Sequence, residues 1–113
     1  MKPIFLPTKH TAAILREYAA QTKESGWHGT VFHTRRALQK LEPAHPEPGA
    51  IRILVELAAA TNALVCELKI PPSPFMTPDD QFANWSSFHR DEDIIQAATA
   101  AAEAIGEKAL CKA

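Results

Sequence analysis

The sequence predicts an all-α fold, a single-domain bundle of four or five helices that spans residues 1–113. Two proline clusters divide the chain, apolar residues recur at helical spacing between them, and the last third is rich in alanine. A length of 113 residues with 46% hydrophobic and 22% charged residues is typical of one globular domain. Because a chain of this size buries only about 65% of its unfolded surface, we expect a thin core and a tendency to associate.

A first helix is predicted from Thr11 to Gly26. Thr8 or Thr11 can cap its start, and Gly26 supplies its stop. The apolar residues that recur at helical spacing along it are Ile14, Leu15, Tyr18 and Ala19.

A second, shorter helix is predicted from Val31 to Leu41, with Thr30 as its cap. Its apolar face carries Val31, Leu38 and Leu41, and Arg35, Arg36 and Lys40 point away from it. An extended first turn is the alternative, because Val31, Phe32 and Thr34 are good strand formers.

The middle of the chain predicts the most buried helix. Three prolines and Gly49 force a loop over residues 42–49, and a helix from Ala50 to Leu68 follows. Its charges, Arg52, Glu56 and Glu67, fall within one narrow stripe on a helix that is otherwise apolar all round. We therefore expect neighbouring helices to cover it on several sides, with only the charged stripe facing water.

The last third predicts two helix starts, one at Thr77 after the proline-rich segment 71–74 and one at residues 91–93. Thr77 can cap, Pro78 suits a first turn, and acidic residues after each start favour the positive end of the helix dipole. We expect a break near residues 87–90, and a single bent helix over 78–111 is the alternative. The alanine-rich end permits close approach, so we expect it to pack antiparallel to the central helix.

Neither a membrane span nor a secretory signal is visible. No apolar run reaches the roughly 18 residues that a span needs, and residues 1–7 hold too few apolar positions for a signal peptide. A cytoplasmic protein without a membrane partner is expected. Two cysteines, Cys66 and Cys111, cannot form a disulfide scaffold or a four-cysteine zinc site.

Charge is divided along the chain although the net charge is only -1. Residues 1–40 carry seven basic and two acidic side chains, a net +5, whereas residues 41–113 carry five basic and eleven acidic ones, a net -6. The two regions therefore attract each other within one molecule or between two. The alternative is that the basic first third meets an external anion such as a phosphate backbone.

No spacing in the sequence predicts catalysis, a cofactor or a metal. His28 and His33 are five residues apart, which does not match the i, i+4 zinc pair of a helix. Cys66 lies in the most apolar helix, where a thiol is usually a small hydrophobic side chain. The four glycines stand alone, so no glycine-rich phosphate loop is present. We expect a protein that is not an enzyme.

A partner-binding segment is predicted around the second proline cluster. Apolar and aromatic side chains follow a stiff, exposed segment there, and such residues are enriched at interface centres. The candidate protein-binding residues are Phe75, Met76, Phe82, Trp85 and Phe88. The alternative is that these rings fill the space between the central and last helices, and both can hold in a dimer.

A nucleic-acid site is predicted as an alternative on the second helix. The basic run from Thr34 to Leu41, the proline loop and the segment from Leu54 to Asn62 resemble part of a Cro or repressor type helix-turn-helix domain. The resemblance implies that Arg35, Arg36, Gln39 and Lys40 face a DNA groove, where arginine reads guanine and glutamine reads adenine. The preceding turn departs from that family, because it carries the indole of Trp27.

These observations predict a small, non-enzymatic regulatory or adaptor protein that acts by binding another protein and self-associates, most simply as a homodimer. The alternative prediction is a DNA-binding transcriptional regulator that uses the basic helix around residues 30–41.

Overall fold

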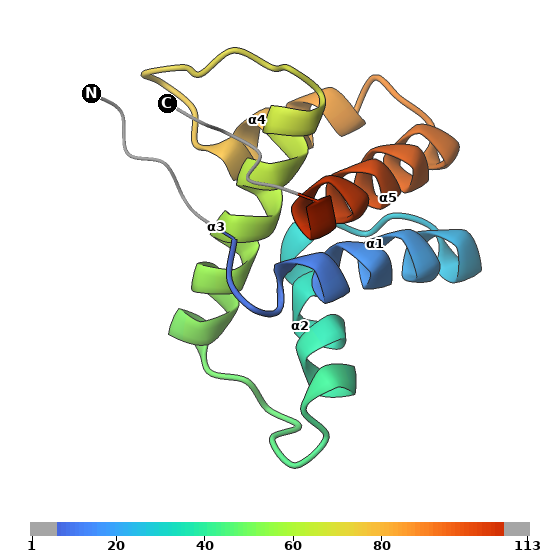
Figure 1. Cartoon of the computed structure of the whole chain (residues 1–113), viewed down its shortest axis with the longest axis vertical. Coiled ribbons are helices and arrows are strands. Elements are labelled where there is room, and N and C mark those ends of the chain that lie inside the picture. Colours follow the sequence, from blue (N-terminus) through green and yellow to red (C-terminus); the bar gives the residue numbers. More distant parts are fainter. Residues whose placement is uncertain (1–6, 108–113) are drawn as a thin grey trace.

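The computed structural model describes residues 7–107, and this part of the chain folds into five α-helices without a strand (Figure 1). The helices are α1 (Thr11–Ser25), α2 (Thr30–Leu41), α3 (Ala50–Glu67), α4 (Pro78–Ser86) and α5 (Asp91–Glu107). The all-α bundle is confirmed. The break between α4 and α5 is confirmed as well, so the single bent helix is excluded within the described range.

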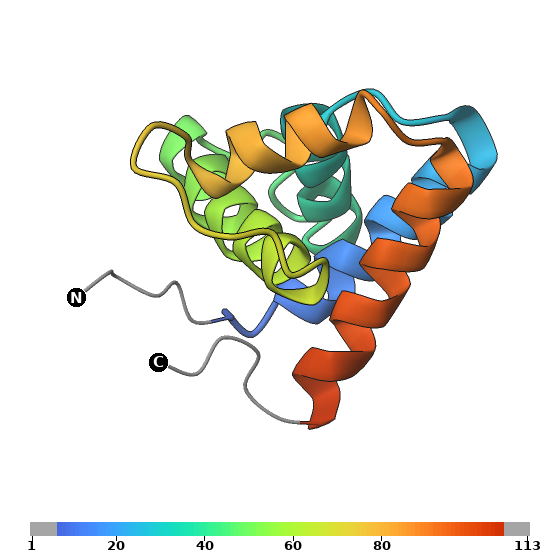
Figure 2. The ribbon, with the colours of Figure 1, turned by 90° about the horizontal axis from the view of Figure 1, so that it is seen from above.

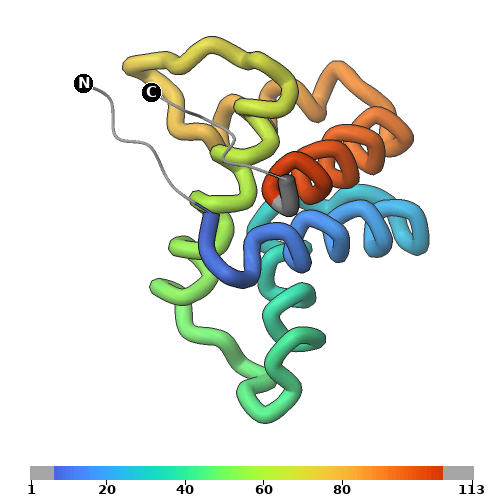
Figure 3. The backbone as a smooth tube through the Cα atoms, viewed as in Figure 1, coloured from blue at the N-terminus to red at the C-terminus, as the bar shows by residue number. Residues whose placement is uncertain are grey.

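Within the described part of the chain, α3 packs against each of the other four helices, so its predicted central position is confirmed. Figure 2 shows α5 running antiparallel to α1, and this is the most extensive helix pair of the fold. A short turn sends α2 away from α1, and α3 returns beside α2 after the 42–49 loop, as the tube in Figure 3 shows. The predicted contact between α3 and α5 is confirmed. Its predicted antiparallel direction is wrong, because α5 lies along α1 and crosses α3 instead (Figures 1 and 2).

Local sequence explains the helix ends. At α4, the Thr77 hydroxyl accepts a hydrogen bond from the Asp80 N–H at 3.1 Å, and Pro78 occupies the first turn, as predicted. At α1 the N–H of Gly26 donates to the carbonyl of Thr22, in a conformation with φ of 90° that favours glycine. The predicted cap of α2 is wrong, because Thr30 is its first helical residue and its hydroxyl donates to Asp79 instead.

The predicted cap of α1 by Thr8 or Thr11 is also wrong. His10 holds the N-cap position and makes no side-chain cap. The two threonines instead bond to each other, and the Thr8 hydroxyl donates to Glu56 of α3 at 2.6 Å. The start of α1 is therefore fixed to α3 rather than closed on itself.

The core is built from small side chains and a few large ones. Four alanines of α5 and three of α3 are buried, which allows the helices to approach closely. The largest fully buried apolar side chains are Tyr18, Phe82, Ile14, Leu15, Leu38, Leu64 and Ile94. They come from all five helices, so one core unites the described part of the chain.

The predicted burial of α3 is wrong for its first half. Glu56, placed by its spacing on a solvated stripe, is only 5% exposed, whereas Ile51 is 79% exposed and Leu54 and Val55 are exposed too. The Glu56 carboxylate accepts from Thr8 and lies 3.8 Å from Nε of Arg52. These partners offset the free-energy cost of burying the Glu56 carboxylate. Because Glu56 faces the core, the apolar residues on the other side of the first two turns face the solvent.

The Arg52 guanidinium joins this cluster to the end of α2. It lies 2.6 Å from the Glu42 carboxylate, and its hydrogen bond there lowers the pKa of Glu42 below its ordinary value. Glu42 also lies 3.7 Å from the His10 ring. The cluster connects the beginning of α1, the end of α2 and the first half of α3.

The glycine before α2 provides a test of backbone strain. Gly29 has φ of 104° and ψ of 158°, a region open essentially to glycine alone, although an added Cβ would meet nothing within 4 Å. We expect Gly29→Ala to lower the free energy of unfolding by about 1 to 3 kcal/mol, through strain and not through a clash. Urea denaturation measures the change.

Gly49 is the matched control, because it also has open space for a Cβ but an ordinary φ of -69°. Gly49→Ala should lower stability by less than about 1 kcal/mol, because alanine is a poorer N-cap residue than glycine but adds no backbone strain here. Equal effects of the two substitutions would contradict the assignment of strain to Gly29.

Candidate functional site

The predicted protein-binding residues do not form one surface. The expectation that Phe82 contacts a partner is wrong, because its side chain is fully buried in the core. Phe75 is 92% exposed and Met76 is exposed beside it, ahead of α4, whereas Phe88 is 79% exposed beyond the other end of that helix. Trp85 is half-buried between these extremes and is the residue around which a site can be built.

Trp85 is held in a stack of three rings. Its indole lies against Phe82, with centroids 5.6 Å apart and planes 21° apart, and against His89 at 3.9 Å and 14°. The His89 ring is oriented by its Nδ1–H, which donates to the Trp85 carbonyl at 2.7 Å. Because Phe82 is fixed in the core, the indole has a fixed orientation at the surface.

The Trp85 groove lies between the end of α3, the end of α4 and the first half of α5, with a volume of about 390 Å³. Its lining residues are Glu67, Leu68, Trp85, His89, Asp93, Gln96, Ala97 and Ala100. Two carboxylates in one groove attract a cation through charge-assisted hydrogen bonds, and the stacked indole of Trp85 adds an apolar wall beside them.

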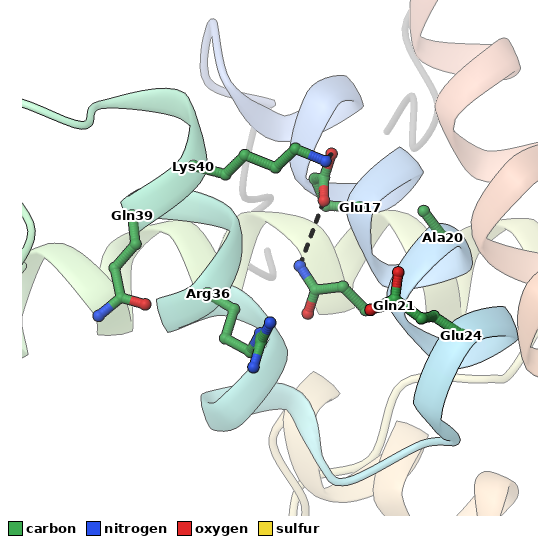
Figure 4. A pocket seen from close by; sticks show the side chains of 7 residues that line it. All are labelled: Glu17, Ala20, Gln21, Glu24, Arg36, Gln39 and Lys40. Atoms are coloured by element: carbon green, nitrogen blue, oxygen red, sulfur yellow. Dashed lines mark hydrogen bonds and ion pairs between the residues drawn. The ribbon is translucent and has the colours of Figure 1, made fainter.

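A second groove of about 540 Å³ lies between α1 and α2 (Figure 4). Its α1 wall carries the carboxylates of Glu17 and Glu24, and its α2 wall carries Arg36 and Lys40. An ion pair of 3.2 Å joins Lys40 to Glu17, and Gln21 donates to Glu17 at 3.3 Å, reaching toward α2 in Figure 4. The walls of this groove therefore have opposite charges.

The four predicted nucleic-acid residues lie along α2 and each has a partner within the chain. Arg35 pairs with Glu47 at 3.3 Å, Lys40 pairs with Glu17, and Gln39 donates to the Pro46 carbonyl at 2.9 Å. Arg36 lies over the Phe32 ring, 5.6 Å from its centroid. The structure thus brings the four residues together on one helix, with carboxylates close to two of them.

His33 has the surroundings of a functional residue, and the sequence pattern did not indicate them. Its side chain is fully buried, and its Nε2 accepts from the His28 N–H at 2.9 Å, so Nδ1 carries the proton and donates to Gln21 at 2.8 Å. The Trp27 indole stacks on it at 4.6 Å. Burial is the main cause that lowers its pKa from 6.5 to about 4, helped by nearby His28 and Arg36.

The remaining chemistry-bearing side chains of the described range form no further cluster. Residues 7–107 contain no group of three or more histidine, cysteine, aspartate or glutamate side chains that could hold a metal ion. Cys66 is disulfide-bonded and not the thiol expected from the sequence. In the same range, no helix is both long enough and apolar enough to cross a membrane.

Comparison of the chain with protein-family models, with curated proteins and with solved structures finds no match. The candidate sites are therefore argued from their own geometry.

The neutral state of His33 makes stability depend on pH. In the unfolded chain the His33 imidazole has a pKa near 6.5 and binds a proton below that pH. In the folded chain the same imidazole binds a proton only when the pH falls to about 4. The free energy of unfolding therefore has its full value above pH 6.5 and decreases by up to about 3 kcal/mol as pH falls toward 4. Urea denaturation at a series of pH values measures it.

His33→Gln is the matched variant, since glutamine can also accept from His28 and donate to Gln21 but does not titrate. We expect the difference in stability between the two proteins to shrink as pH falls from 6.5 to 4. Parallel pH profiles of the two proteins would show that His33 is not the titrating group.

Proposed function

We propose that the chain is a non-enzymatic regulatory or adaptor domain that binds a basic segment of a partner protein in the Trp85 groove. The observation that carries the proposal is the fixed indole beside two carboxylates, Glu67 and Asp93, on three different helices. An arginine or lysine side chain placed there would meet both carboxylates and pack its apolar stem beside the indole.

The surroundings of the groove support a protein partner. Phe88 lies just beyond α4 and is 79% exposed, so it offers an apolar contact next to the acidic groove. Aromatic side chains are enriched at interface centres, and arginine is the charged residue most often found with them. The Asp93 carboxylate is held in place at the start of α5, where it accepts from the Arg90 N–H at 3.1 Å.

The groove can be tested with a short peptide that contains one arginine, and with the same peptide carrying uncharged citrulline. We expect only the arginine peptide to shift the Trp85 indole N–H resonance in NMR titrations. Glu67→Gln combined with Asp93→Asn should weaken binding about tenfold, because both charges are removed while shape and the α5 start are kept. Equal binding of the two peptides would refute the proposal.

Trp85 itself needs a variant that separates binding from packing, because its ring lies on Phe82 of the core. Trp85→Phe keeps an aromatic ring in the stack, whereas Trp85→Ala removes it. We expect helix content to stay nearly unchanged in both, and peptide binding, followed by calorimetry, to fall most in Trp85→Ala. Loss of folding together with binding in both variants would make Trp85 a core residue only.

A DNA-binding regulator is the second candidate, favoured by the turn between α1 and α2. Gly26 and Gly29 enclose a four-residue connection between two helices that meet at a steep angle (Figure 1), which is the general form of a helix-turn-helix. Trp27 does not obstruct this turn, because its ring packs inward on His33 and Phe82. Arg35 and Arg36 are exposed on the following helix.

For this candidate, we expect Arg35→Ala combined with Arg36→Ala to weaken duplex DNA binding and to lower the slope of log affinity against log salt by about two. Fluorescence anisotropy at several salt concentrations measures both quantities. Lys9→Ala with Lys23→Ala, at exposed positions outside α2, is the control. An unchanged affinity and slope in the arginine variant would end this candidate.

A further inference from the structure

We propose that the basic partner of the Trp85 groove is a second copy of this chain, which inserts the exposed face of its α2, with Arg35 and Arg36, into the groove. The inference rests on the proposed function, because it names the partner for the same site. The contact is head to tail, since the two surfaces of the pair are different.

The chemistry of the two surfaces is complementary. The groove offers the carboxylates of Glu67 and Asp93 beside the indole of Trp85. The α2 face offers two adjacent guanidinium groups, flanked by the exposed apolar side chains of Val31 and Phe32. An arginine suits an acidic and aromatic site better than a lysine, because its planar group stacks on rings and bonds carboxylates in pairs.

Arg35 and Arg36 of α2 can leave their contacts within the chain and bind the groove of a second molecule. The ion pair of Arg35 with Glu47 is exposed at both ends, with 53% and 77% of the side chains accessible, so water and salt weaken it. Arg36 already lies on an aromatic ring, that of Phe32. Transfer of these groups to a groove with two carboxylates therefore replaces a weak contact by a stronger one.

The two surfaces of one molecule are formed by different helices. The Trp85 groove is lined by residues of α3, α4 and α5 and their ends, and no residue of α2 lines it. The attraction between the basic first third and the acidic remainder is thus not fully satisfied within a monomer. It is satisfied between two molecules.

Head-to-tail contacts allow a complementation experiment. The groove variant carries Glu67→Gln and Asp93→Asn, and the face variant carries Arg35→Glu and Arg36→Glu. The controls carry the same charge changes at exposed positions elsewhere, Asp80→Asn with Glu103→Gln and Lys9→Glu with Lys23→Glu. Sedimentation velocity from low micromolar to several hundred micromolar chain gives the mass distribution, and circular dichroism verifies folding.

We expect the unaltered chain and both controls to associate more as concentration rises and as salt falls. Each variant alone should remain monomeric, with an association constant reduced at least about tenfold. An equimolar mixture should form a one-to-one pair and nothing larger, because each variant retains one intact surface. This rescue requires that the contact join two different surfaces, so a dimer that pairs two α2 faces or two grooves would not show it.

Three outcomes overturn the inference: a monomeric unaltered chain at all concentrations, variants that still associate alone, or a mixture that stays monomeric with both variants folded. If the chain stays monomeric but binds the arginine peptide of the preceding section, the proposed function stands and only self-recognition fails. If the chain also ignores the peptide, both fail. Association abolished by added duplex DNA through the α2 face would assign that face to nucleic acid instead.

Discussion

The buried imidazole of His33 fixes the corner on which the other parts of the fold depend. It accepts from the turn at His28 and donates to Gln21 of α1, so one neutral ring on α2 connects the turn and both flanking helices. Trp27 stacks on the same ring and reaches Phe82 of α4. This corner sets the direction of α2 relative to α1, and it thereby separates the basic helix from the acidic groove.

Local sequence signals made the positions of the helices predictable. The buried face of each helix could not be predicted in the same way, as α3 shows. The proline clusters, Gly26 and the Thr77-Pro78 start act on neighbouring residues only, so their effect can be derived from sequence. Which face of α3 is buried depends on a hydrogen bond between Glu56 and a threonine 48 residues away. A helical periodicity that assigns every charge to solvent cannot detect such a partner.

Of the groove residues discussed, the sequence indicated Trp85 but not the two carboxylates that lie beside it. Phe82 and Trp85 are three residues apart, which suggested one shared helix face. Their side chains leave the helix axis about 60° apart, so Phe82 lies in the core and Trp85 at the boundary between core and surface. Glu67 ends α3 and Asp93 begins α5, so only the fold brings these carboxylates to the indole. Sequence reasoning assigned them to a solvated stripe and to a helix start.

The charge division of the chain has a different meaning once the helices are in place. Some of the basic residues are paired locally, as Lys40 is with Glu17 and Arg52 is with Glu42. These pairs tie α1 to α2 and α2 to α3, and they stabilise the corner. Arg36 rests on a ring, and the groove carboxylates face a cleft that no residue of α2 lines, so these charged groups do not neutralise each other within the groove. A fold that separates opposite charges by a rigid corner favours contacts between molecules over contacts within one.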